Sequence, residues 1–480
     1  MLNMGISLGI IGLQLFVLGR ILTPADHGLF GIVLAIQAII QPIVEFGLGP
    51  AYIQKPKIEH YTTDVFFIIN IACGLLNTII IAILAPILSW VYEEPLLLGM
   101  LLLFAISPML GSIGWQAKAM LMRDKRFFSL MLSTSVSGVI GVSVTIWMAF
   151  QGYSVWALCT GPVVTASISS VILLMLVRHR YRIPKAQHFV STMGCLRFGA
   201  LITTTRIINS LQNSVDKLLV GKFYSESLLG GYARSSQLAQ MPDRQIRNPI
   251  GTVAMSYLCR LSQDYQQRAR AYKVLLITTV IFPSVFSVTL MFMGDYLIVF
   301  VMGEQWVFAG PYIRILSICG TAMIIRGGLM TIHYCENHMK QWTMFSGLGV
   351  ALGIGLPLIA AINGAPIKTF AWIISLSVLS YWLIILIKVV LRYMSVEILR
   401  ELAYTAGLST ATIFLAGYGT RRLVETSLNM QPLFVKLLTV SLGTLCMVIF
   451  TQFAFNRKEV RLVFEYSKKG KNSNCSGKKE

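Results

Sequence analysis

Two polar stripes of cationic and amide side chains run through the otherwise apolar stretch 197–257. The first stripe is Arg206, Asn209, Asn213 and Asp216, and the second is Arg234, Gln237, Gln240, Arg244 and Arg247. Steps of three and four residues place side chains on one face of a helix. The spacing therefore predicts two neighbouring helices that each turn a cationic, amide-rich face toward water.

The chemistry of these groups indicates what the two faces could bind. An Arg guanidinium is a planar fork that pairs with phosphate oxygens, and Asn and Gln amides suit sugar hydroxyls. A charged side chain inside an apolar helix is costly unless it faces a cavity or a partner. Arg206 lies about 15 Å along its predicted helix, too deep to reach the interface easily. Its position therefore favours a water-filled cavity.

The composition places these helices in a membrane. Of the 480 residues 55% are hydrophobic and 12% are charged, and the mean hydropathy is +0.70. A soluble globular protein carries roughly twice that charged fraction. The net charge of +20 is attributed to membrane topology, because no basic stretch outside the apolar segments is interleaved with stacking aromatics. The eight cysteines show no CxxC or zinc spacing, so we expect no metal, no cofactor and no disulfide framework.

Apolar runs of about 20 residues, long enough to cross a hydrocarbon core, recur along the whole chain. They lie at 2–20, 28–53, 64–91, 96–121, 127–150, 154–178, 196–221, 227–257, 272–300, 309–334, 342–362, 366–390, 399–418 and 431–455. The sequence therefore predicts an all-α polytopic membrane protein with about 14 transmembrane helices.

Basic residues are distributed unevenly over the connections between these runs. Alternate connections, beginning with 54–63, hold most of the Lys and Arg, and the intervening ones hold few. Because cytoplasmic loops are enriched in Lys and Arg, both termini are predicted to be cytoplasmic. Residues 2–20 lack a basic n-region and an Ala-x-Ala site, which favours a retained first helix over a signal peptide. We expect 467–480 to be disordered.

An internal repeat relates two parts of the chain. Aligning 19–20 with 221–222, a shift of 202 residues, also places Gly28 on Gly230. The shift spans six predicted helices, so the copies share one orientation and predict two pseudo-symmetric six-helix lobes. The expected divisions are an N-lobe at 1–190, a C-lobe at 191–396, two additional transmembrane helices at 397–456 and a basic cytosolic tail at 457–480.

Five short motifs carry a resemblance to a known family. They are GRILTPADHGL at 19–29, EFGLGPAYIQ at 45–54, YSVWAL at 153–158, DKLLVG at 216–221 and LGGYA at 229–233. In order and spacing the chain resembles the polysaccharide-transporter branch of the multidrug/oligosaccharidyl-lipid/polysaccharide exporter superfamily, the Wzx-type flippases. The resemblance extends to about residue 390. His27 departs from it, because the family usually has an aromatic residue there.

This resemblance implies a transporter, and it does not imply an enzyme. It implies two lobes around a central cavity that move undecaprenyl-pyrophosphate-linked oligosaccharide from the cytoplasmic to the periplasmic leaflet by alternating access. Such repeat units would serve the synthesis of exopolysaccharide, capsule or O-antigen lipopolysaccharide at the bacterial inner membrane. The implied partners are the lipid-linked oligosaccharide, membrane lipids, and a polysaccharide polymerase with its export machinery, and none is a nucleic acid.

Such a cargo would explain the stripes, because its pyrophosphate and glycan are costly to move through hydrocarbon unshielded. We therefore assign the cations and amides of the stripes, with two further cations in apolar runs, to substrate binding. The assigned residues are Arg206, Asn209, Asn213, Arg234, Gln237, Gln240, Arg244, Arg247, Lys118 and Arg326. Glu45 and Asp216 are candidates for ion coupling or for contact between the lobes.

Structural roles stay open for several of these residues. Arg247 could equally anchor a phosphate headgroup at the interface, and Asp243, four residues earlier, could pair with it. Asp216 and Lys217 could form a structural hinge pair. His27 lies in a motif, but a lone histidine is more often structural.

Two other functions are weighed against the flippase. A multidrug or organic-cation antiporter of the same superfamily would have a cavity rich in acids and aromatics, which the arginines disfavour. A membrane polysaccharide polymerase or ligase would need carboxylates or a basic cluster on a substantial loop, and the predicted outer loops are short. The chain has no Walker-type GxxxxGK[ST], which argues against direct use of ATP.

Overall fold

The structure is a computed structural model in which every element among the described residues is a helix. The described residues are 2–49, 58–177, 181–247, 265–277, 282–336 and 338–394, with isolated residues at 52, 179, 251, 258, 400, 404, 418 and 422. The chain divides into two compact units. The first holds 1–233, 301–305 and 358–367, and the second holds 234–300, 306–357 and 368–480.

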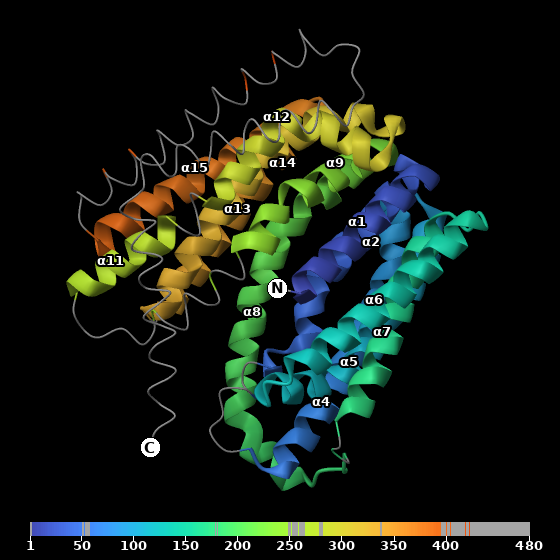
Figure 1. The fold of residues 1–480 in the computed structure, drawn as a ribbon, viewed down its shortest axis with the longest axis vertical. Coiled ribbons are helices and arrows are strands. Elements are labelled where there is room, and N and C mark those ends of the chain that lie inside the picture. Colours follow the sequence, from blue (N-terminus) through green and yellow to red (C-terminus); the bar gives the residue numbers. More distant parts are fainter. Residues whose placement is uncertain are drawn as a thin grey trace. The chain divides into compact units, whose positions relative to one another are not determined.

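The helices of the first unit follow one another through short connections. They are α1 (Leu2–Ile21), α2 (Pro24–Glu45), α4 (His60–Tyr92), α5 (Pro95–Arg123), α6 (Phe127–Phe150), α7 (Val155–Leu176) and α8 (Ala186–Phe223), and α9 (Glu226–Ala239) begins here. Within this unit α4 packs on α5, α7 packs on both α5 and α6, and α2 packs on α8 (Figure 1).

Small residues allow several of these helices to approach closely. Gly141 of α6 faces Thr165 of α7, and Gly161 of α7 faces Thr145 of α6, with no space for an added Cβ at either glycine. Glycine, serine and threonine at helix contacts are typical of membrane helices, where close packing replaces the hydrophobic effect as the driving force.

The ends of α2 differ from the prediction of a helix at 28–53, and both have a local cause. The helix starts earlier, at Pro24, because Thr23 caps it and forms a reciprocal capping box with Asp26. It stops earlier, at Glu45, because Phe46 (φ 39°) and Gly47 (φ 59°) adopt left-handed backbone conformations. Glu45 is thereby the last helical residue of α2.

The second unit continues with further apolar helices. They are η1 (Asp243–Arg247), α11 (Tyr265–Leu276), α12 (Phe282–Met302), η3 (Glu304–Ala309), α13 (Gly310–Cys335), α14 (Met339–Ile362) and α15 (Ile367–Tyr393). Terminal residues of α12, η3 and α14, and the first residue of α15, belong to the first unit. The helices predicted at 399–418 and 431–455 lie outside the described part of the chain, except for the isolated residues 400, 404 and 418.

The second polar stripe is not one continuous helix, contrary to the prediction of a helix at 227–257. α9 ends at Ala239, a turn follows at Gln240, and 243–247 form a π-helical turn. Pro242 lies at this break, and proline disrupts a helix because it lacks an N–H and its ring clashes with the preceding turn. Residues of the stripe before and after the break therefore do not share one regular helical face.

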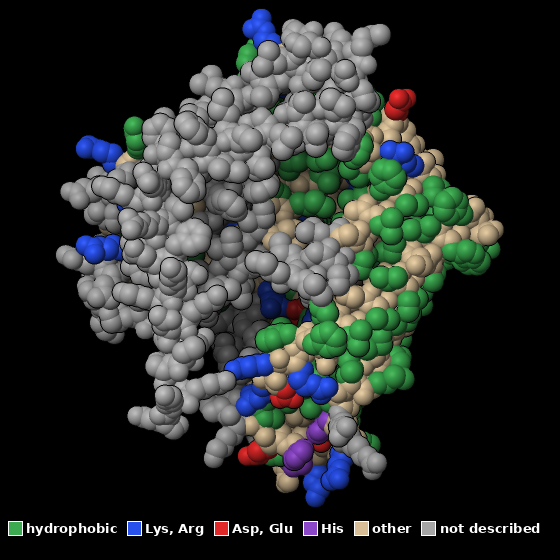
Figure 2. All heavy atoms as spheres, in the orientation of Figure 1, with side chains coloured by type: hydrophobic (Ala, Val, Ile, Leu, Met, Phe, Trp, Pro, Cys, Tyr) green, Lys and Arg blue, Asp and Glu red, His purple; other side chains and the backbone are tan. Residues whose placement is uncertain are grey.

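Eight helices in the described part of the chain are long and apolar enough to cross a membrane. Many of their exposed side chains are large and apolar, including Ile79 and Ile83 of α4 and Trp147 of α6. Figure 2 shows hydrophobic side chains along the flank of the first unit, with Lys, Arg, Asp, Glu and His side chains gathered at its lower end. The prediction of an all-α polytopic membrane protein is confirmed.

The first turns of α2 and α9 cross with their backbones in contact. A Cβ added to Gly28 would overlap the carbonyl of Glu226, and one added to Gly230 would overlap the carbonyl of Pro24. Residues 24 and 28 correspond to 226 and 230 under the shift of 202 that relates the internal repeats. The contact is therefore reciprocal, as expected where two equivalent helices meet at a local two-fold axis.

Candidate functional site

Two cations surround one carboxylate in the first unit. Arg206 of α8 forms an ion pair with Glu45 through its Nη1 atom, and the two side chains are 39% and 25% exposed. Lys118 of α5 interacts electrostatically with the same carboxylate, and its Nζ lies 4.4 Å from the ring centroid of Trp115. Because Glu45 ends α2, where the helix dipole disfavours a negative charge, the nearby cations stabilise it. This group, Glu45–Arg206–Lys118, carries one excess positive charge.

Amide groups of the same unit have unused hydrogen-bonding capacity. Within the described residues, the side-chain oxygens of Asn209 and Asn213 on α8 are buried and find no hydrogen-bond partner. An unsatisfied buried polar atom costs about 1–3 kcal/mol, so these two amides favour water or a hydroxyl-bearing ligand. Gln116, two residues before Lys118, is buried too, and its side chain hydrogen bonds to that of Tyr52.

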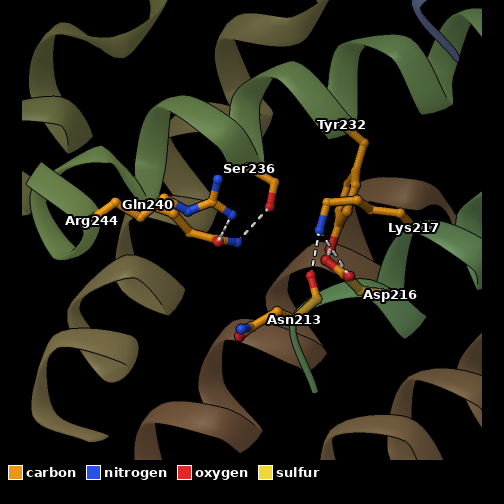
Figure 3. A network of polar contacts seen from close by, with 7 residues as sticks. All are labelled: Asn213, Asp216, Lys217, Tyr232, Ser236, Gln240 and Arg244. Atoms are coloured by element: carbon orange, nitrogen blue, oxygen red, sulfur yellow. Dashed lines mark hydrogen bonds and ion pairs between the residues drawn. The ribbon is translucent and has the colours of Figure 1, made fainter. Parts of the chain in front are cut away.

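Asp216 and Lys217, near the C-terminal end of α8, contact each other and neighbouring groups of the protein (Figure 3). The Tyr232 hydroxyl donates to Oδ2 of Asp216 at 3.1 Å, and Nζ of Lys217 lies 3.2 Å from Oδ1. Nζ of Lys217 also donates to the carbonyl of Asn213 at 2.7 Å. Tyr232 is fully buried, so these contacts favour the structural alternative for Asp216 over a coupling carboxylate.

In the second unit, hydrogen bonds join residues of the second stripe that lie three or four positions apart. Arg234 donates to Oε1 of Gln237 at 2.7 Å, and Arg244 donates to Oε1 of Gln240 at 3.0 Å. Nε2 of Gln240 donates in turn to the Ser236 hydroxyl at 3.0 Å (Figure 3). The amides of this stripe therefore orient its arginines, a role that the spacing alone did not reveal.

A second group of two cations and one carboxylate lies beyond the helix break. Arg247 pairs with Asp243, which confirms the pairing predicted for residues four apart. Arg326 of α13 interacts electrostatically with both of them. Gly327 leaves the space that the Arg247 guanidinium occupies, since an added Cβ would overlap it. Arg247 is only 6% exposed, so the group Asp243–Arg247–Arg326 is a buried cluster with one excess positive charge.

The structure thus brings six of the singled-out charged residues into two groups of the same composition. Lys118 and Arg326 were predicted only as isolated buried cations, and the structure gives each a carboxylate that it shares with a stripe arginine. Trp115 and Gln116 beside Lys118 were not predicted. Their signal was weak, because an aromatic residue and one glutamine in an apolar helix are common.

Most of this chain is similar in sequence to proteins of a known family. A family model described as polysaccharide biosynthesis protein matches residues 17–311. Teichuronic acid biosynthesis protein TuaB of Bacillus subtilis (strain 168) is 23% identical over 459 residues, which cover 94% of this chain and 93% of TuaB. Lipopolysaccharide biosynthesis protein WzxC of Escherichia coli (strain K12) is 23% identical over 317 residues, which cover 66% of this chain and 64% of WzxC.

Solved structures show the same fold at low sequence identity. The lipid II flippase MurJ in an inward closed conformation matches with a TM-score of 0.71 at 15% identity, covering 96% of this chain and 99% of MurJ. An inward-facing multidrug resistance transporter of the MATE family matches with a TM-score of 0.60 at 12% identity, covering 78% of this chain and 92% of the transporter. Because the family model spans more than half of the residues, this multi-pass membrane protein belongs to the polysaccharide biosynthesis protein family.

Proposed function

We propose that this protein is a flippase that moves undecaprenyl-pyrophosphate-linked oligosaccharide repeat units from the cytoplasmic to the periplasmic leaflet of a bacterial inner membrane. The observation that carries the proposal is the pair of groups in which two buried or half-buried cations share one carboxylate. WzxC, a relative, is named for lipopolysaccharide biosynthesis, and ExoT of Rhizobium meliloti (strain 1021), 21% identical over 304 residues, is named as a succinoglycan biosynthesis transport protein.

The cations would bind the pyrophosphate by exchanging their counter-ions. In the first group, Glu45 neutralises part of the charge of Arg206 and Lys118 when no cargo is bound. A pyrophosphate offers more negative charge and more acceptor oxygens than one carboxylate, so it displaces Glu45 from the guanidinium. Asp243 plays the same part for Arg247 and Arg326.

The amides would contact the glycan. The buried oxygens of Asn209 and Asn213 accept hydrogen bonds from sugar hydroxyls, which relieves the cost of leaving them unpaired. Within the second unit, Arg234, Gln237, Gln240 and Arg244 would offer further polar groups to the cargo. Alternating access of an N-lobe at 1–190 and a C-lobe at 191–396, with 397–456 as two additional helices, completes the mechanism that we propose.

The charge pattern of the connections supports the placement that accompanies this function. Both termini lie in the cytoplasm, and the basic segment 457–480 is a cytosolic tail. The repeat units would be supplied at the cytoplasmic leaflet and handed to a polysaccharide polymerase and export machinery on the periplasmic side. An organic-cation antiporter is disfavoured, because both groups carry excess positive charge and would repel a cationic drug.

Complementation of a strain that lacks the gene tests this proposal. We expect lipid-linked repeat units to accumulate on the cytoplasmic leaflet of the deletion strain, and wild type to relieve the accumulation. Arg206→Ala should fail, whereas Arg392→Ala, which removes an exposed arginine bonded to Gln341, should rescue at equal membrane abundance. Absence of any lipid-linked intermediate in the deletion strain would overturn the proposal, as would full rescue by Arg206→Ala.

A further inference from the structure

Three carboxylates from three helices meet at the crossing of α2 and α9. Asp26 lies in the first turn of α2, Glu94 is the N-cap residue of α5, and Glu226 is the first residue of α9. Glu94 and Glu226 also line a cavity of about 440 Å³ in the first unit. The charge pattern of the sequence predicts that this end of the molecule faces the periplasm.

Asp26 is held in place by three hydrogen bonds. The backbone N–H and the hydroxyl of Thr23 donate to Oδ2 at 2.9 and 2.8 Å, and the Ser154 hydroxyl donates to Oδ1 at 2.6 Å. The carboxylate therefore fixes the start of α2 to the start of α7. Its negative charge acts on Glu226 across the crossing.

Glu226 meets a second carboxyl group directly. Its side chain hydrogen bonds to that of Glu94, and two carboxyl groups can form such a bond only if they share a proton. Burial, then the hydrogen bond and the charge of Glu94, and then the charge of Asp26 raise the pKa of Glu226 from 4.5 to about 7. Glu226 precedes the predicted membrane span, so a proton can reach it from the aqueous phase.

The other ionisable groups around Glu226 are engaged elsewhere. Nζ of Lys222 donates to the carbonyl of Val91 at 2.6 Å and lies 3.2 Å from Oε1 of Glu93. The hydroxyls of Tyr92 and Tyr224, which also line the cavity, donate to the carbonyls of Leu218 and Ala365. His27, buried beside Asp26, contacts the carbonyl of Leu18 through Nε2 at 3.3 Å.

We propose that Glu94 and Glu226 form a proton-binding site that latches the α2–α9 crossing. With one proton shared, the carboxyl pair ties α5 to α9 next to the glycine contact, where Gly28 packs on the Glu226 carbonyl. Without that proton, three negative charges face one another across the contact, and their repulsion loosens it. The ligand is a proton, so the latch does not depend on which cargo the protein carries.

The sign of the pH dependence follows from the two states of Glu226. When the crossing is open and Glu226 is solvated, its pKa returns toward 4.5, and when the crossing is closed the pKa is about 7. The closed form is therefore fully favoured below the lower value and loses stability as pH rises through the interval. Between pH 5.5 and 7.5 the ratio of open to closed protein should rise on the order of tenfold.

Distance measurement between two spin labels tests the latch on the full chain in lipid nanodiscs. The labels replace Leu96 in the first turn of α5 and Ser227 in the first turn of α9, both of which are exposed. Genetically encoded spin-label amino acids avoid the eight native cysteines. We expect the short-distance population to dominate at pH 5.5 and to decrease by pH 7.5, as the ratio of open to closed protein rises on the order of tenfold.

Three variants separate the latch from general effects of pH. Glu226→Gln and Glu94→Gln each replace a titrating carboxyl group with a neutral amide that can donate a hydrogen bond to the remaining carboxylate, so both should keep the crossing closed and make the distances independent of pH. Glu93→Gln is the matched control, because Glu93 is the adjacent residue and lines the same cavity but pairs with Lys222, and it should keep the wild-type pH response. Distances in wild type that do not change between pH 5.5 and 7.5 would overturn the latch, and so would an unchanged pH response in both Glu226→Gln and Glu94→Gln.

Discussion

At the scale of single residues, the two charged groups explain why ionisable side chains persist in a chain with so few of them. Each carboxylate is placed so that it neutralises only one of its two cations. Complete neutralisation would leave no attraction for an anionic cargo, and bare arginines would be costly in an apolar surrounding. One excess charge in each group is a compromise between these two costs.

Substitutions of the Glu45–Arg206 pair should change cargo affinity in opposite directions. Arg206→Ala removes a charge-assisted hydrogen bond worth about 1.5–3 kcal/mol, so the Kd for undecaprenyl pyrophosphate should rise about 10- to 100-fold. Glu45→Gln removes the competing counter-ion, so the Kd should fall. Tryptophan fluorescence titration in detergent measures both constants, with Glu93→Gln as a control.

The control is matched in charge, because Glu93 also pairs with a basic residue but is 84% exposed and lies at the far end of α4. A Kd that rises in Glu45→Gln as much as in Arg206→Ala would contradict the counter-ion role. In that case Glu45 would contact the cargo itself.

Replacing the unpaired amide Asn209 should separate stability from transport. Asn209→Leu keeps the side chain's size and removes a buried oxygen that has no partner among the described residues, so the melting temperature should stay the same or rise. Asn77→Leu is the contrast, because the Asn77 oxygen likewise has no partner among the described residues but its buried Nδ2 donates to the carbonyl of Ile40 at 3.2 Å. Its melting temperature should fall, as measured by differential scanning fluorimetry.

Flipping of a lipid-linked oligosaccharide should respond differently. Asn209→Leu should slow it despite a stable fold, since a leucine cannot bond a sugar hydroxyl. Unchanged flipping together with a lower melting temperature would assign Asn209 to structure alone.

At the scale of helices, the glycine crossing leaves no space for a side chain at Gly28 or Gly230. Gly28→Ala or Gly230→Ala would place a methyl group on a backbone carbonyl, which cannot move aside as a flexible side chain can. Overpacking of this kind costs about 1–3 kcal/mol, so each variant should lower the melting temperature or separate α2 from α9. Gly347→Ala in α14 has free space and should be neutral. Neutral behaviour of both crossing variants would contradict the contact.

Hydropathy predicted where apolar helices occur in the chain far better than it predicted the residues at which these helices end or break. The prediction at 127–150 coincides with α6 because turns bound that helix on both sides, whereas α2 ends at Glu45 through the left-handed Phe46, which no pattern of apolar residues reveals. Pro242 marked the break in the second stripe, but proline is common in membrane helices and did not by itself indicate one.

Part of the candidate site could also be predicted. Helical spacing identified the stripes and paired Asp243 with Arg247, because both lie within one turn. Spacing could not join Arg206 to Glu45 or Arg326 to Asp243, since these pairs come from helices far apart in the sequence. The cluster at Glu226 was missed for the same reason.

At the scale of the whole molecule, the latch predicts how transport depends on pH. If the α2–α9 crossing must loosen for release on the side predicted to be periplasmic, flipping should be slower at an outside pH of 5.5 than at 7.5. Glu226→Gln should stay slow at both values, because its crossing does not sense protons. Rates in proteoliposomes with the inside pH held constant provide the measurement.

The proposed function requires that the buried and half-buried cations of the two groups recognise the pyrophosphate of a lipid-linked glycan and carry it across the membrane. Flipping by the purified protein in proteoliposomes should be compared for two lipids, undecaprenyl-pyrophosphate-linked oligosaccharide and the same glycan on an uncharged lipid. We expect rapid flipping of the pyrophosphate form only, and loss of that preference in the double variant Arg206→Ala, Arg326→Ala. Equal flipping of the two lipids by wild type would contradict it.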